Sequence, residues 1–155
     1  MSEVENISDQ LQRIYDGDAV HGPALRKLLI DLSAEQAVAQ LLPRTHSIWE
    51  LVLHLAAWND VFKRRLEGHP ADEPEGGDFP PTGEASREAW AAALERLDQS
   101  HRRLLAHVFA LSAARLQDRT PGRDYSLRFM LEMAVRHYVY HTGQIALLRK
   151  AFVTD

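Results

Sequence analysis

Residues 127–150 read LRFMLEMAVRHYVYHTGQIALLRK, and this stretch decides the fold class. Apolar residues recur in it every three or four positions, which is the spacing of one face of an α-helix. The apolar stripe consists of Leu127, Met130, Leu131, Ala134, Tyr138, Ile145 and Leu148. His137, His141 and Gln144 line one flank of this stripe, so we expect their side chains to face the interior or a cleft of a helical protein.

Residues 46–58 read HSIWELVLHLAAW and have the same helical periodicity. Thr45 or Ser47 can cap the N-terminus of this second helix, and Glu50, three residues after Ser47, completes a capping box. The apolar pattern continues to about Leu66, where we expect the helix to end.

Three histidines on these two helices form a candidate metal site. His137 and His141 are four residues apart, so both can bind one ion from a single helix face, and His54 can supply a third ligand. Three neutral imidazoles leave one coordination position open for water or a substrate. Zinc, nickel, iron and manganese all accept such ligands, so the sequence does not choose among them. The alternative interpretation is three core histidines that are hydrogen-bonded separately.

The remaining histidines are weaker candidates. His101 lies on the apolar seam of another predicted helix, and we interpret it as a core histidine or as a hydrogen-bond partner of a ligand. We expect His21, His46 and His69 at surface or turn positions, and we expect His107 to be exposed.

The rest of the chain also favours helices. Predicted helices cover residues 4–14, 23–32, 47–66, 86–108 and 127–151. Gly17 or the His21-Gly22-Pro23 step ends the first of them, and Pro23 can open the next because proline is tolerated in a first helical turn.

Residues 67–84, EGHPADEPEGGDFPPTGE, are rich in proline, glycine and acidic residues, which predicts a long loop. Such a loop either covers a functional site or only crosses over between helices. Phe79 is the loop residue that we expect to turn inward, and with Trp58 it is expected to line a pocket beside the histidines. Gln144, one turn beyond His141, is expected to hydrogen-bond a ligand or contact a substrate, and the alternative is a polar residue at the edge of the helices.

Composition narrows the classes of function. The chain has 155 residues, 45% of them hydrophobic, and we expect a single domain over residues 1–155. The absence of cysteine excludes disulfides, thiolate ligands and a cysteine nucleophile, and a net charge of −4 argues against nucleic acid as a partner. No stretch predicts a membrane span or a secretory signal, so we expect a cytoplasmic protein. We also expect a small-molecule substrate, and a homodimer is the assembly that we consider.

The chain resembles the DinB-like (YfiT-type) family of metal-dependent proteins. The resemblance covers nearly the whole chain, and its most specific parts are HSIWELVLHLAAW (46–58), GDFPP (77–81) and HYVYHTGQIALLRK (137–150). It implies an all-α four-helix bundle with one long crossover loop and a divalent metal held by His54, His137 and His141. Some relatives resemble S-transferases that use bacillithiol or mycothiol, others resemble maleylpyruvate isomerases, and the reaction therefore stays open.

Three functions are consistent with these features. The first is a transferase in which the three-histidine ion activates a low-molecular-weight thiol. The second is a hydrolase that uses a metal-bound hydroxide, for which Glu50 is the only candidate base. The third is a metal-binding or ligand-binding bundle without catalysis. The sequence assigns no catalytic residue.

Overall fold

The computed structural model describes residues 1–152 and contains only helices and connecting segments in that range. The elements are α1 (Glu3–Asp16), α2 (Leu25–Leu29), α3 (Ala34–Val38), α4 (Ile48–Leu66), α5 (Arg87–Phe109), the short 3-10 helix η1 (Ala113–Gln117) and α6 (Leu127–Arg149). The prediction of an all-α protein is confirmed. Residues 153–155, the end of the predicted single domain, lie outside the described residues.

The N-terminus of α4 is fixed by its first four residues. The hydroxyl of Ser47 accepts a hydrogen bond from the backbone N–H of Glu50 at 3.2 Å, and the Glu50 carboxylate accepts one from the N–H of Ser47 at 2.7 Å. These two bonds satisfy backbone donors that have no partner inside the helix. The predicted capping box is confirmed. Ser86 caps α5 with a single bond, since its hydroxyl accepts a hydrogen bond from the backbone N–H of Ala89.

The prediction of one helix over residues 23–32 is wrong. The helix α2 ends at Leu29, and a second short helix, α3, follows it. Ser33 and Gln36 form a capping box of their own, so the chain starts a new helix at Ser33 rather than extending the first.

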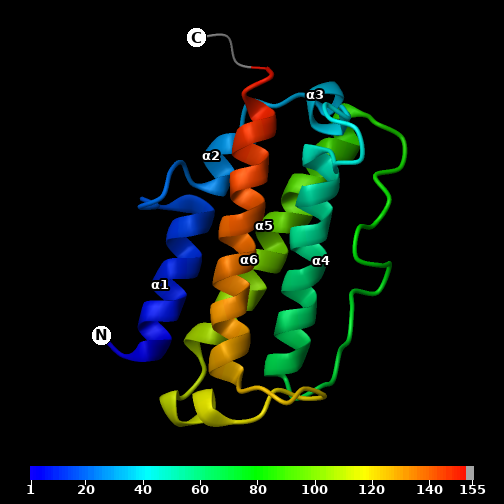
Figure 1. Cartoon of the computed structure of the whole chain (residues 1–155). Coiled ribbons are helices and arrows are strands. Elements are labelled where there is room, and N and C mark those ends of the chain that lie inside the picture. Colours follow the sequence, from blue (N-terminus) through cyan, green and yellow to red (C-terminus); the bar gives the residue numbers. More distant parts are fainter. Residues whose placement is uncertain (153–155) are drawn as a thin grey trace.

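The four long helices pack side by side, with α4 and α1 each contacting both α5 and α6 (Figure 1). The helices α1 and α6 run in one direction, whereas α4 and α5 run in the other, and the connection between α4 and α5 returns along the outer side of α4 (Figure 1). Two consecutive parallel helices need a connection as long as the helix itself, which explains the loop of residues 67–86.

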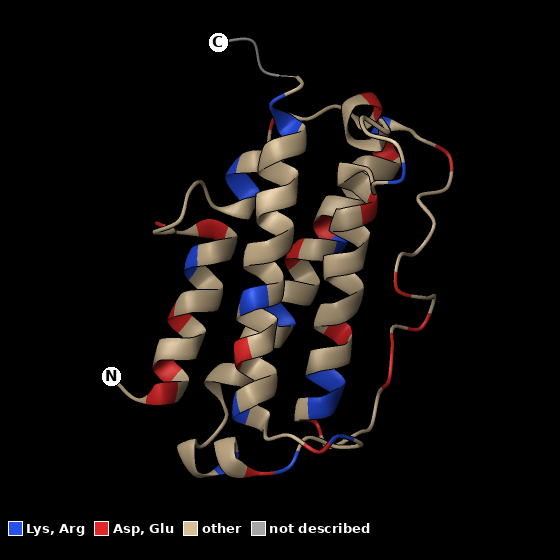
Figure 2. Cartoon of the chain, viewed as in Figure 1, with Lys and Arg blue, Asp and Glu red and all other residues tan. Residues whose placement is uncertain are grey.

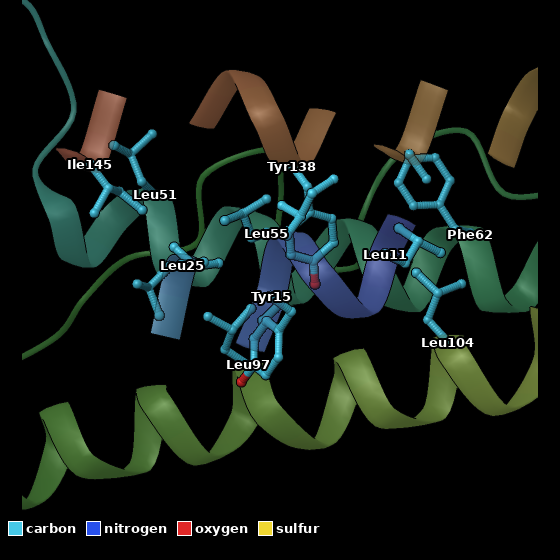
Figure 3. Packing of buried hydrophobic residues seen from close by; sticks show 14 of the residues in the cluster. Leu11, Tyr15, Leu25, Leu51, Leu55, Phe62, Leu97, Leu104, Tyr138 and Ile145 are labelled. Atoms are coloured by element: carbon cyan, nitrogen blue, oxygen red, sulfur yellow. The ribbon is translucent and has the colours of Figure 1, made fainter. Parts of the chain in front are cut away.

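The centre of the molecule is apolar. Side chains from all four long helices meet there, as Figure 3 shows for Leu11, Leu55, Leu97 and Ile145. Each is at most 1% exposed, and burying a leucine side chain stabilises the fold by about 1.5–3 kcal/mol. The resulting core holds α4 and α6 in a fixed relation to each other.

A buried chain of polar side chains also crosses this core. Asn59 of α4 donates a hydrogen bond to the Tyr138 hydroxyl of α6 at 2.8 Å, and that hydroxyl is 3.0 Å from Nδ1 of His101 in α5. Tyr15 of α1 stacks on the His101 ring with centroids 4.0 Å apart. His101 is therefore a core histidine, one of the two roles expected from the sequence.

Arg65 anchors the first part of the long loop. The residue is 2% exposed, and its guanidinium nitrogens Nε and Nη2 donate hydrogen bonds to the Ala71 carbonyl at 2.9 and 2.6 Å. The same guanidinium lies 5.9 Å from the centroid of the Trp58 ring, a cation–π distance. Arg65 thereby links the loop to the face of α4 that carries His54.

Candidate metal centre

His54, His137 and His141 come together between α4 and α6. One ring nitrogen from each histidine lies within 4.8 Å of the others, and Nε2 of His54 is 2.8 Å from Nε2 of His137. Nitrogen ligands bind zinc at about 2.0–2.1 Å, so ligands around one ion stand roughly 3–3.5 Å apart. The three residues predicted from the sequence therefore occupy one cluster whose size is compatible with a single divalent ion.

Two of the three histidines have a fixed tautomer. Nδ1 of His54 donates a hydrogen bond to the backbone carbonyl of Asp78 at 2.6 Å, and Nδ1 of His141 donates to Oε1 of Gln144 at the same distance. Because carbonyl oxygens only accept, each Nδ1 carries the proton and each Nε2 carries a lone pair, which in His54 faces Nε2 of His137. This arrangement is typical of metal-binding histidines, whose outer nitrogen bonds a carbonyl or carboxylate.

The environment keeps the three imidazoles neutral. Burial is the main cause that lowers the pKa of all three, and the neighbouring histidines lower the pKa of His137 further, to about 3. A protonated imidazole has no lone pair for a metal, so the lowered pKa values favour the form that can bind one.

The long loop completes the site through Asp78 and Phe79. The Phe79 ring is sandwiched between two imidazoles, with centroids 3.5 Å from His46 and 4.2 Å from His54. Asp78 accepts a hydrogen bond from the indole N–H of Trp58 at 2.7 Å, and the same oxygen is 3.3 Å from Nδ1 of His54. Phe79 turns inward as expected, and His46 is exposed in the segment before α4 as expected, although its ring also stacks on Phe79.

A cavity of about 410 Å³ opens beside the three histidines. It is lined by His54, Trp58, Phe62, Asp78, Phe79, Met133, His137, Tyr140 and His141. Trp58 and Phe79, which the sequence placed beside the site, are among these residues, and Gln144 is not. The volume is that of a site for a small organic molecule.

Asp78 is the functional candidate that sequence reasoning missed. Its neighbour Phe79 was singled out, but a carboxylate in an acidic loop gives no signal of its own when the loop carries several. Glu50, the carboxylate considered as a base, is used in the capping box of α4. His107, expected to be exposed, is half-buried and bonds the Arg103 carbonyl and Glu67.

A comparison with protein families gives a match over most of the chain. The family model of the DinB superfamily matches residues 20–145. This chain belongs to the DinB superfamily. The matched range of this DinB superfamily member includes all three histidines and the long loop. Searches of the curated proteins and of the solved structures found no match. None of the helices in residues 1–152 has the length and apolar character needed to cross a membrane.

Proposed function

We propose that this DinB superfamily protein is a metal-dependent transferase that uses a low-molecular-weight thiol. Membership of the superfamily and the three-histidine cluster fit a metal-binding enzyme, and the cluster is compatible with a divalent ion. The observation that carries the proposal is the pair of hydrogen bonds at Nδ1 of His54 and His141, which leave the Nε2 atom of each ring as the candidate ligand within a cluster of three histidines. Three such ligands leave a coordination position for a second molecule.

In this proposal His54, His137 and His141 hold the ion, and the Asp78 carbonyl and Gln144 keep two of the rings oriented. A divalent ion held there would supply Lewis acidity, which lowers the pKa of a thiol so that no protein base would be needed to remove its proton. The thiolate sulfur then forms a bond to an electrophilic carbon of the second substrate. The leaving group departs with the electron pair of the broken bond, and the thiol proton passes to solvent.

A thiol fits the site better than water because the described residues place no carboxylate at the Nε2 atoms. Hydrolysis in metalloproteases relies on a carboxylate base beside the attacking water. Asp78 lies at the Nδ1 side of His54, 3.3 Å from that nitrogen, and bonds Trp58. Glu50 is used by the N-terminus of α4. A nucleophile that needs no protein base is therefore favoured.

The test uses the purified protein loaded with zinc, manganese, nickel or iron in turn. Each form is incubated with bacillithiol, mycothiol or glutathione and an aryl halide, and adduct formation is followed by absorbance and mass spectrometry. Thiol-dependent conjugation that is lost after chelation and in His54→Ala supports the proposal. The exposed His21→Ala serves as the matched control and should conjugate like the wild type.

Two other outcomes identify the alternatives. Turnover of esters or amides without thiol indicates a metal-dependent hydrolase. A protein that binds the ion but turns over neither class of compound is a metal-binding or ligand-binding module, and the transferase proposal is then wrong.

A further inference from the structure

The walls of the cavity beside the histidines are aromatic and apolar. Trp58 and Phe62 of α4 lie with ring centroids 5.8 Å apart, and Phe79 of the loop adds a third ring. Met133 and Tyr140 of α6 complete the lining opposite them. Aromatic side chains of this kind bind flat apolar groups by stacking and edge contacts.

Formal charge is nearly absent from the same region. Residues 51–59 of α4 and 137–148 of α6 include no Lys, Arg, Asp or Glu, and both segments are tan in Figure 2. Among the described residues that line the cavity, Asp78 is the only one with a formal charge, and it is negative. The side chains that line the cavity thus offer no cation to the carboxylate, sulfonate or phosphate group of a ligand.

The arginines adjacent in sequence to this region are engaged elsewhere. Arg136 pairs with Glu132 at 3.0 Å on the surface of α6. Arg65 donates hydrogen bonds to the Ala71 and Asp72 carbonyls and to the Tyr125 hydroxyl. Neither side chain lines the cavity, so neither can neutralise an anionic ligand inside it.

We propose that the electrophilic substrate is an uncharged molecule with an aromatic or similarly apolar group, and that the cavity discriminates against anionic electrophiles. This inference rests on the proposed function, because only the transferase reaction requires the substrate to be an electrophile. A thiolate and the Asp78 carboxylate together balance the two positive charges of a bound ion, so an anionic electrophile gains no net attraction. It still loses its hydration among the aromatic walls, which is unfavourable without a compensating partner.

The test compares two inert ligands that differ in charge, uncharged 3-nitrotoluene and anionic 3-nitrobenzenesulfonate, whose sulfonate coordinates metals weakly. Binding to the metal-free protein, in which no ion adds positive charge beside the cavity, is measured by isothermal titration calorimetry without any thiol. We expect 3-nitrotoluene to bind at least about tenfold more tightly, because the sulfonate is desolvated without a cation. Equal or tighter binding of the sulfonate, or no binding of either compound, overturns the inference.

A pair of lysine substitutions on α6 gives the matched control. Met133→Lys adds a cation to the cavity wall, and Phe129→Lys adds one an α-helical turn earlier, at an exposed side chain outside the lining. We expect Met133→Lys to reduce the preference for 3-nitrotoluene to about threefold or less, while Phe129→Lys keeps the wild-type preference. Equal effects of the two substitutions contradict the inference. Because no thiol and no reaction are involved, this result is independent of whether conjugation is observed.

Discussion

The backbone carbonyl of Asp78 accepts a hydrogen bond from Nδ1 of His54 over 2.6 Å, so one residue of the long loop orients a side chain of α4. The neighbouring residue, Phe79, stacks on the same imidazole. The position of the loop and the geometry of the histidine cluster are therefore coupled. A ligand that binds only the ordered arrangement stabilises the loop by mass action.

Replacement of Phe79 by alanine tests this coupling. The substitution removes two ring contacts, to His46 and to His54, which together contribute about 1–3 kcal/mol to docking of the loop. We expect faster protease cleavage within residues 67–86 and weaker metal binding, by up to about tenfold. Cleavage is followed by mass spectrometry with and without added zinc.

The control for this experiment is Phe109→Ala, which removes a phenylalanine that is 71% exposed at the end of α5. It should leave both the cleavage pattern and the metal affinity unchanged. If Phe79→Ala behaves in the same way, the loop does not support the histidine cluster.

A second prediction concerns the metal itself. We expect about one divalent ion per chain in the wild type, as three-histidine sites hold a single ion, and much less in the His137→Ala and His141→Ala variants. Metal analysis of the dialysed proteins by mass spectrometry measures the stoichiometry, and circular dichroism checks that the helices are retained. Undiminished metal in both variants would mean that the three histidines are not the ligands.

Local signals allowed the four long helices and the histidine cluster to be predicted. Ser47 and Ser86 mark helix starts because a cap acts on residues only three positions away. The pair His137 and His141 follows from helical spacing, and the apolar stripe beside it indicates which way the pair faces. Their approach to His54 depends on the packing of α4 against α6, which the apolar stripes also encode.

Contacts made by the loop could not be predicted in this way. Asp78 accepts a hydrogen bond from Trp58, which is 20 positions away in the sequence, and Arg65 donates to backbone carbonyls rather than to a carboxylate. His46 stacks on Phe79 across 33 positions, a contact that has no helical periodicity. Such contacts depend on the path of a segment without regular structure. The cytoplasmic location and the homodimer stay predictions.

Gln144 offers a test of how the ligands are oriented. Gln144→Leu keeps the approximate size of the side chain and removes the oxygen that accepts the proton of His141 Nδ1 at 2.6 Å. Loss of such a partner weakens metal binding by about 10–100-fold. Gln144→Glu retains an accepting oxygen. Its zinc affinity should be at least that of Gln144→Leu and close to that of the wild type. Competition with a zinc chelator measures the affinities, and identical values for the leucine variant and the wild type would show that the bond has no influence.

The last prediction concerns pH and uses the core histidine, which is not part of the cluster. Burial, with a smaller effect of Arg102, lowers the pKa of His101 to about 4, although Asp98 and Asp16 act in the opposite direction. In the unfolded chain a histidine titrates near pH 6.5. Between pH 6.5 and 4 the unfolded state therefore binds a proton at this position that the folded state does not bind. The free energy of unfolding must fall as the pH falls through this window.

At pH 5 the proton bound by His101 in the unfolded state lowers the free energy of unfolding by about 2 kcal/mol relative to neutral pH. In His101→Gln the titrating group is absent. Between pH 7.5 and pH 5 the free energy of unfolding of this variant should therefore fall by about 2 kcal/mol less than that of the wild type. This comparison does not depend on how stable the variant is at pH 7.5. Urea unfolding of both metal-free proteins at the two pH values measures the loss. His54, His137 and His141 contribute equally to both proteins, so the difference isolates His101. Equal losses in the two proteins would mean that His101 is already protonated in the fold at pH 5, and that its burial between Tyr15 and Tyr138 does not exclude the charge.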